Sequence, residues 1–127
     1  YTEDDSVYYF SFTTTATKSK KGSHHHSPTK NMSMHLWPNA LLMGKYNHAP
    51  NKDWFENDGI VNSVSMSHPH TSNVINLGIL PIKGTWQSVR NLNFDHQAII
   101  GHHVSQTENE EILAIYNKHC RLLWSLK

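Results

Sequence analysis

Two short segments of this chain carry side chains that could do acid–base chemistry. Asp58 lies in an Asn-Asp-Gly tripeptide, and His96 follows about forty residues later, directly after Asp95. An aspartate followed by a histidine near the chain's end is the order of the last two members of a Ser–Asp–His hydrolase triad. In such a triad the histidine takes the proton of the serine, and the aspartate orients the imidazole. The serine motif Gly-x-Ser-x-Gly does not occur in the sequence.

The local context of Asp58 and His96 leaves their role open. The chain holds 11 histidines, and a histidine in a loop is commonly solvated or structural. An aspartate in Asn-Asp-Gly more often forms the turn than takes part in catalysis. A general base needs a place at the mouth of a cleft, which loops after sheet strands supply. The elements around the two residues therefore decide whether they can act together.

Two segments are predicted to be strands of a sheet. Residues 7–14 are rich in β-branched and aromatic side chains and begin apolar on both faces, which is typical of a strand buried in a parallel sheet. Residues 84–89 are predicted to form the last strand. The intervening stretches are predicted from their turn and breaker residues: a long polar loop at 15–34, a short helix at 36–46, an extended piece at 60–66 and a loop at 67–83.

The clearest predicted element is an amphipathic C-terminal helix of about five turns. Thr107 and Glu110 match the capping box, in which hydroxyl and carboxylate satisfy free backbone N–H groups. One face then recurs at three- and four-residue steps, at Ile112, Leu113, Tyr116, His119, Cys120, Leu123 and Trp124. The order strand, loops, strand, helix indicates the closing section of an α/β sheet domain.

Composition narrows the class of protein. The formal net charge is +1, and the lysines at 18, 20 and 21 have no interleaved aromatics, so no nucleic acid partner is predicted. No apolar stretch is long enough to span a membrane. The hydrophobic fraction of 37% is below the roughly 45–50% apolar content of self-sufficient domains. With a first residue that is Tyr1 rather than Met, this indicates that residues 1–127 are the C-terminal fragment of one larger domain.

The chain resembles, from end to end, the C-terminal portion of the secreted lipases of staphylococci and thermophilic bacilli, a branch of the α/β-hydrolase superfamily. The matching residues are 7–12, 54, 56–66, 83–86, 95–96 and 99–101. The resemblance implies that Asp58 and His96 complete the triad, while the serine and the oxyanion hole lie upstream. Residues 15–52 match least, and we expect them to be a substrate-facing lid or a loop particular to this lineage. Trp54, Phe55 and Trp86 are expected to pack near the site.

The implied function is that of a secreted carboxylic ester hydrolase, a triacylglycerol lipase or carboxylesterase, acting on a lipid or ester substrate. The family also binds calcium through acidic side chains just after the catalytic histidine. Here the corresponding positions are near Ala98 and His103, neither of which offers the hard oxygen ligands that calcium prefers. The family's zinc site lies mostly in upstream sequence. No cofactor is therefore predicted for this segment.

Two alternatives remain open on sequence alone. The first is a non-catalytic homologue with the same fold, used as a binding or structural module. The second is a histidine-dependent metal-binding domain, because imidazole suits zinc. Its candidate ligands are His24, His25, His26, His68, His70, His102 and His103. Adjacent histidines in polar loops do not converge easily on one ion, and no cysteine pair completes a four-ligand set.

Overall fold

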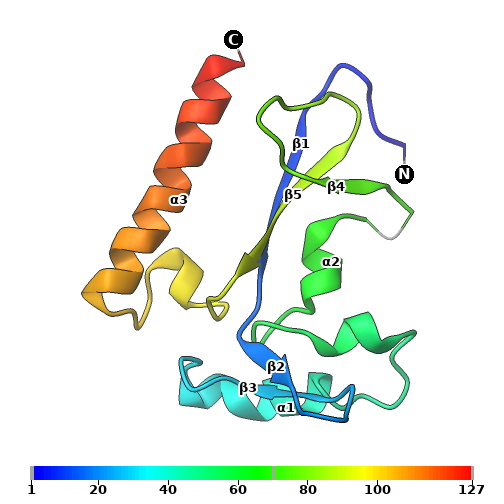
Figure 1. The fold of residues 1–127 in the computed structure, drawn as a ribbon, viewed down its shortest axis with the longest axis vertical. Coiled ribbons are helices and arrows are strands. Elements are labelled where there is room, and N and C mark those ends of the chain that lie inside the picture. Colours follow the sequence, from blue (N-terminus) through cyan, green and yellow to red (C-terminus); the bar gives the residue numbers. More distant parts are fainter. Residues whose placement is uncertain (1, 70, 127) are drawn as a thin grey trace. The chain divides into compact units, whose positions relative to one another are not determined.

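The computed structural model describes residues 2–69 and 71–126 (Figure 1). The chain divides into two compact units, one ending at His96 and the other beginning at Gln97. The first unit contains both predicted strands, and the second contains the predicted C-terminal helix.

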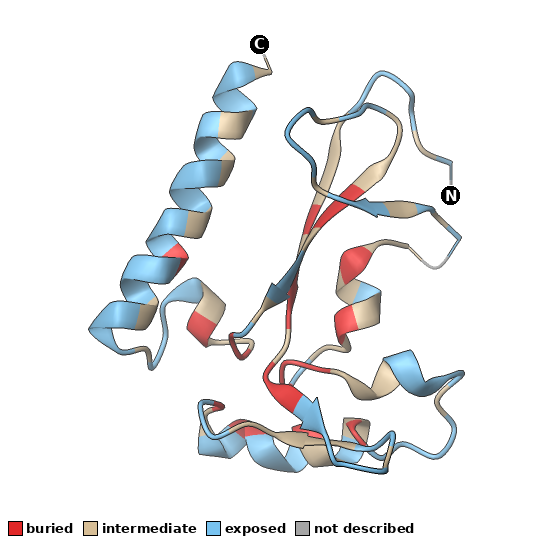
Figure 2. Cartoon of the chain, viewed as in Figure 1, coloured by how far each residue is buried: buried red, intermediate tan, exposed pale blue. Residues whose placement is uncertain are grey.

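The first unit is built on a three-stranded parallel sheet in the order β1-β5-β4. Its strands are β1 (Tyr9–Thr14), β4 (Val74–Asn76) and β5 (Trp86–Leu92). The predictions for residues 7–14 and 84–89 are therefore confirmed. The loop predicted at 67–83 is wrong at β4, because a strand of three residues is too short to show a period-2 pattern. Figure 2 shows buried residues on β1 and β5, on α2 and in the region of β2 and β3.

A second layer of the first unit combines a hairpin with a helix. It comprises β2 (Thr17–Ser19), β3 (His26–Pro28), the 3₁₀ turn η1 (Met34–Leu36) and α1 (Trp37–Met43). We call it the hairpin–helix layer (Figure 1). The strands are antiparallel, and the buried apolar side chains of the layer are Ala16, Met32, Leu36 and Ala40. The helix near residues 36–46 is confirmed, whereas the structureless loop at 15–34 is wrong because two three-residue strands pair there.

Two short helical elements follow the hairpin–helix layer, η2 (Lys52–Phe55) and α2 (Ser63–Ser67). The extended piece predicted at 60–66 is therefore wrong. Helix α2 is held by contacts with β1 that are distant in sequence: the Ser63 hydroxyl donates to the Thr14 carbonyl at 2.8 Å, and the Ser11 hydroxyl donates to the Ser67 carbonyl at 2.6 Å. Such tertiary contacts override the weak local preference of a one-turn helix.

The second unit contains η3 (Ala98–Ile100) and the long helix α3 (Gln106–Ser125). The capping box is formed by Ser105 and Glu108, two residues earlier than predicted, because both positions satisfy the same Ser/Thr-x-x-Glu pattern. The predicted apolar face is largely open: of its members only Ile112 is buried, and Cys120 is exposed. Among the described residues, no helix has the length and apolarity needed to cross a bilayer.

Candidate active site

The turn that carries Asp58 is fixed by its neighbours on both sides. Asn57 is fully buried. Its side chain donates to the Ala40 carbonyl at 3.3 Å and accepts from the Gly59 N–H at 3.0 Å. Gly59 has φ +99°, and a Cβ there would lie 2.9 Å from Leu36 Cβ. Only glycine fits this backbone conformation and this close approach.

The Asp58 carboxylate is fully buried and receives hydrogen bonds on both oxygens. Its Oδ1 accepts from the N–H groups of Ile60 at 3.0 Å and Val61 at 2.8 Å. Its Oδ2 accepts from the Thr14 hydroxyl at 2.9 Å. Donors of this kind stabilise the ionised form of a carboxylate and compensate for its removal from water.

His96 lies against the same carboxylate. Its Nδ1 is 2.9 Å from Asp58 Oδ2, and its backbone N–H donates to the Asp58 carbonyl at 3.0 Å. The carboxylate favours the tautomer with the proton on Nδ1, which leaves Nε2 as an acceptor. The imidazole is 44% exposed, whereas the Asp58 side chain is 1% exposed. The pair therefore presents one oriented nitrogen to the outside of this chain.

The sheet explains why two residues about forty positions apart meet. Thr14 ends β1 and pairs with Leu92, which ends β5. His96 follows β5 closely, and Asp58 is bonded to Thr14, so the pair lies at the carboxyl ends of two parallel strands. This is the edge at which open α/β sheets place their ligands and catalytic groups.

Two further residues help to position the site and were not predicted from the sequence. Thr14 is a buried hydroxyl donor to Asp58, and its position at the end of a predicted strand was the only available signal. Asp95 is also buried, and its Oδ2 accepts from the Ser33 N–H at 2.8 Å. Asp95 thus ties the segment that carries His96 to the loop before η1.

Phe55 and Trp86, which were both expected to pack near the site, lie in different places. Phe55 packs against His25 with ring centroids 5.5 Å apart. Trp86 packs on Tyr9 at 5.3 Å, at the amino end of β5. It is therefore separated from the His96 edge by the length of the strand, roughly 20 Å, and the prediction that it packs near the site is wrong.

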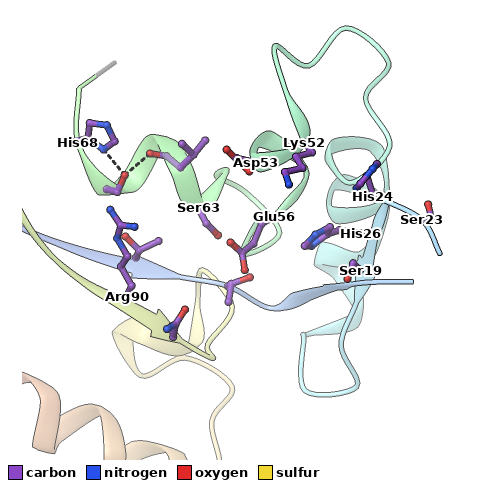
Figure 3. A pocket seen from close by; sticks show the side chains of 15 residues that line it. Ser19, Ser23, His24, His26, Lys52, Asp53, Glu56, Ser63, His68 and Arg90 are labelled. Carbon is purple, nitrogen blue, oxygen red and sulfur yellow. Dashed lines mark hydrogen bonds between the residues drawn. The ribbon is translucent and has the colours of Figure 1, made fainter. Parts of the chain in front are cut away.

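A separate polar cavity of about 530 Å³ opens beside η2 and the hairpin (Figure 3). His24 and His26 line it from the hairpin, Asp53 and Glu56 from η2 and its end, and Arg90 from β5. Burial lowers the pKa of His26, and the charge of Glu56 partly opposes this effect. Neither Asp58 nor His96 lines the cavity.

The structure gives little support for a metal centre. Within residues 2–69 and 71–126, no group of three or more His, Cys, Asp or Glu side chains is placed to hold a metal ion. Of the candidate histidines, His70 lies outside the described residues. The positions implied for calcium do not fit that ion either, since Ala98 is a buried methyl side chain and His103 offers nitrogen rather than oxygen.

The chain is similar to known lipase-like proteins. A family model described as "Lipase-like, C-terminal domain" matches residues 3–122. The crystal structure of Staphylococcus hyicus lipase aligns with a TM-score of 0.82 and 23% identity, covering 96% of this chain and 32% of that one. EstA from Clostridium botulinum aligns with a TM-score of 0.72 and 33% identity, covering 80% of this chain and 26% of that one. Lipase 1 from Pelosinus fermentans aligns with a TM-score of 0.56 and 26% identity, covering 76% of this chain and 28% of that one.

These matches confirm the resemblance and the fold class. The parallel sheet followed by a C-terminal helix is the closing portion of an α/β-hydrolase-like fold, shared with bacterial lipases. The chain spans between 26% and 32% of the length of these three proteins. By its sequence and its fold, it belongs to the lipase-like C-terminal domain family.

Proposed function

We propose that this chain supplies the general base, His96, and the orienting acid, Asp58, of a serine-dependent carboxylic ester hydrolase, a triacylglycerol lipase. The observation that carries the proposal is the 2.9 Å contact between His96 Nδ1 and a fully buried Asp58 carboxylate. Residues 1–127 would then be the C-terminal part of one hydrolase domain, whose nucleophilic serine lies elsewhere in the full-length protein.

The proposed reaction is acyl transfer in two steps. His96 Nε2 takes the proton of the serine hydroxyl as its oxygen attacks the ester carbonyl, and the resulting imidazolium returns that proton to the leaving alcohol. Water then attacks the acyl-enzyme with His96 again as base, and the imidazolium returns the proton to the serine oxygen as the carboxylic acid is released. Asp58 stays ionised, keeps the imidazole in the required tautomer and stabilises the imidazolium.

The environment of Asp58 suits this role. A buried carboxylate that must remain charged needs several donors, and this one has two backbone N–H groups and the Thr14 hydroxyl besides His96. Membership of the lipase-like family supports a lipid or other ester as the substrate. We also propose that the full-length protein is secreted.

The test is p-nitrophenyl ester hydrolysis by the full-length protein and its His96→Ala variant. We expect kcat/KM to fall by roughly 10⁴-fold or more, the usual loss when a triad member is removed. His102→Ala, which removes an exposed histidine six residues later in the sequence, is the matched control and should retain activity. Circular dichroism must show that each variant is folded.

Two results would contradict the proposal. Wild-type hydrolysis that persists unchanged in His96→Ala would remove His96 from the mechanism. A folded wild-type protein without activity on esters of any chain length would instead indicate the non-catalytic homologue.

A further inference from the structure

The short connection from β1 to β2 lies against the turn that carries Asp58. Thr14, at the end of β1, donates to the Asp58 carboxylate at 2.9 Å. Two residues later, the Ala16 backbone N–H donates to the Asn57 carbonyl at 3.0 Å. The connection therefore contacts two residues of the turn, Asp58 through its side chain and Asn57 through its backbone.

Thr17, the first residue of β2, adds a contact through its hydroxyl. Its Oγ1 accepts from the Asn57 N–H at 3.0 Å and donates to the Asn57 carbonyl at 3.1 Å. A hydroxyl can accept and donate at the same time, so one side chain engages both backbone groups of Asn57. The next neighbour of this hydroxyl is His26, whose Nδ1 lies 3.3 Å from the same oxygen.

These hydrogen bonds lie in the interior of the first unit. Thr17 is 6% exposed and Asn57 is 0% exposed. Residues of this chain alone bury them, so their burial does not depend on sequence outside residues 1–127. A buried backbone group that loses its partner is costly, because water does not take the partner's place. The Thr17 hydroxyl therefore contributes to the position of the Asn57 backbone.

The Asn57 backbone in turn fixes the start of Asp58. The Asn57 carbonyl and the Asp58 N–H belong to one planar peptide unit, so an anchor on this carbonyl also orients the Asp58 backbone. On the other side of the residue, the Asp58 carbonyl accepts from the His96 N–H at 3.0 Å. Asp58 is thus held between two backbone anchors, and a shift at either one would change its contact with the imidazole.

We propose that Thr17 is a positioning residue for the triad, because its hydroxyl fixes the Asn57 backbone and thereby the orientation of Asp58 toward His96. This inference rests on the proposed function. Thr17 acts through the backbone and not on the reacting atoms, so its loss should lower kcat and leave KM nearly unchanged. The loss should be partial, since the Asn57 side chain also holds the turn through Ala40 and Gly59.

The test compares Thr17→Val with Thr17→Ser in the full-length protein. Valine keeps the branched shape but removes the hydroxyl, whereas serine keeps the hydroxyl. A small misplacement caused by a remote change can cost as much as about 100-fold. For a soluble short-chain ester, we expect kcat to fall at least about tenfold in Thr17→Val, with KM within about twofold of the wild-type value. Thr17→Ser should restore most of kcat.

Thr15→Val is the matched control. It removes a hydroxyl from the same connection, and within the described part of the chain this hydroxyl has no hydrogen-bond partner. Its kcat should equal that of the wild type. Circular dichroism must show that each variant is folded. If Thr17→Val does not fold, Thr17→Cys takes its place, because a thiol is only a weak donor and acceptor, and it should give an intermediate loss of kcat.

Hydrogen–deuterium exchange reports the same contact without any substrate. The Asn57 N–H loses its acceptor in Thr17→Val, so we expect exchange in peptides spanning residues 57–61 to accelerate at least about tenfold. Peptides from α3 should exchange at the wild-type rate, which separates a local effect from general destabilisation. Thr17→Ser and Thr15→Val should match the wild type over residues 57–61.

Three outcomes would overturn this inference alone, provided that ester hydrolysis still depends on His96. These are a wild-type kcat in folded Thr17→Val, equal losses of kcat in Thr17→Val and Thr15→Val, and unchanged exchange over residues 57–61 in Thr17→Val. A wild-type protein without His96-dependent hydrolysis would instead overturn the proposed function and this inference with it.

Discussion

The Asp58 carboxylate is oriented by more than its imidazole partner. Two of its donors are backbone N–H groups of its own turn, one is the hydroxyl of Thr14, and only the fourth belongs to His96. Three of the four donors that hold the carboxylate therefore do not come from the imidazole. An acid held in this way is preorganised, so little reorganisation is needed when charge develops on the histidine.

At this scale we predict that Thr14→Val impairs the proposed catalysis without abolishing it. Valine has nearly the same shape but cannot donate to Asp58 Oδ2, so a buried carboxylate loses one of its donors. We expect kcat for ester hydrolysis to fall about tenfold and the free energy of unfolding to fall by about 1–3 kcal/mol. Ester kinetics and urea unfolding of the full-length protein measure the two effects.

Two variants control for packing at Thr14. Thr14→Ser keeps the hydroxyl and should restore most of kcat. Thr13→Val removes a neighbouring buried hydroxyl that pairs with Ser88 at 3.0 Å instead of Asp58, and it should leave kcat near the wild-type value. Equal losses of kcat in Thr13→Val and Thr14→Val would show that the effect is structural.

At the scale of elements, the turn that carries Asp58 approaches η1 closely at Gly59, which lies against Leu36. Gly59→Ala would introduce a side chain at φ +99° and place its Cβ 2.9 Å from Leu36 Cβ. We expect a loss of stability of about 2–4 kcal/mol, combining backbone strain with overpacking. Thermal and urea unfolding measure this loss.

Gly22→Ala is the matched control for backbone strain alone. Gly22 also has positive φ, at +77°, but a Cβ there would meet no atom within 4 Å. Its cost should stay near 1 kcal/mol. If Gly59→Ala were no more destabilising than Gly22→Ala, the close approach to Leu36 would not matter for the turn.

We predict that His26, in the hairpin–helix layer, makes stability depend on pH. Burial lowers the pKa of His26 below its ordinary value, so the unfolded chain binds a proton more readily than the folded one. The contribution of His26 to the free energy of unfolding is complete above about pH 6.5, which is its pKa in the unfolded chain. This contribution is lost as the pH falls through the lower pKa of the folded state. We therefore expect His26→Gln to reduce the loss of stability as the pH falls below about 6.5.

Urea unfolding at a series of pH values measures this slope. His25→Gln, on the same strand connection but at an exposed position, controls for removing a histidine. A slope in His26→Gln identical to that of the wild type would contradict the assignment of the lowered pKa to His26.

Elements with strong local signals could be predicted from the sequence. β1, β5 and α3 combine length with clear composition, and the Asn-Asp-Gly turn is marked by its residues. The shorter elements could not be predicted, because β2, β3 and β4 are too short to show a period-2 pattern and α2 is held by contacts with β1 that are distant in sequence. Asp58 and His96 were singled out by residue order and by family resemblance, but their contact depends on β1 and β5 lying side by side.

At the scale of the whole molecule, the proposed site is shared between this chain and sequence outside it. This chain presents one oriented imidazole nitrogen, backed by a buried acid, at the carboxyl edge of a parallel sheet. The chain spans 32% of the Staphylococcus hyicus lipase with which it aligns. A serine hydroxyl, an oxyanion hole and an acyl-binding pocket would have to come from the remainder of the protein.

The most direct test is covalent labelling of the full-length protein by a fluorophosphonate, which reacts with a serine activated by a histidine. We expect rapid labelling of one serine outside residues 1–127, located by mass spectrometry of peptides, and a rate at least about 10³-fold lower in His96→Ala. His102→Ala should label at the wild-type rate. Labelling that proceeds at an unchanged rate in folded His96→Ala, or that falls on a residue of this chain, would contradict a triad completed by Asp58 and His96.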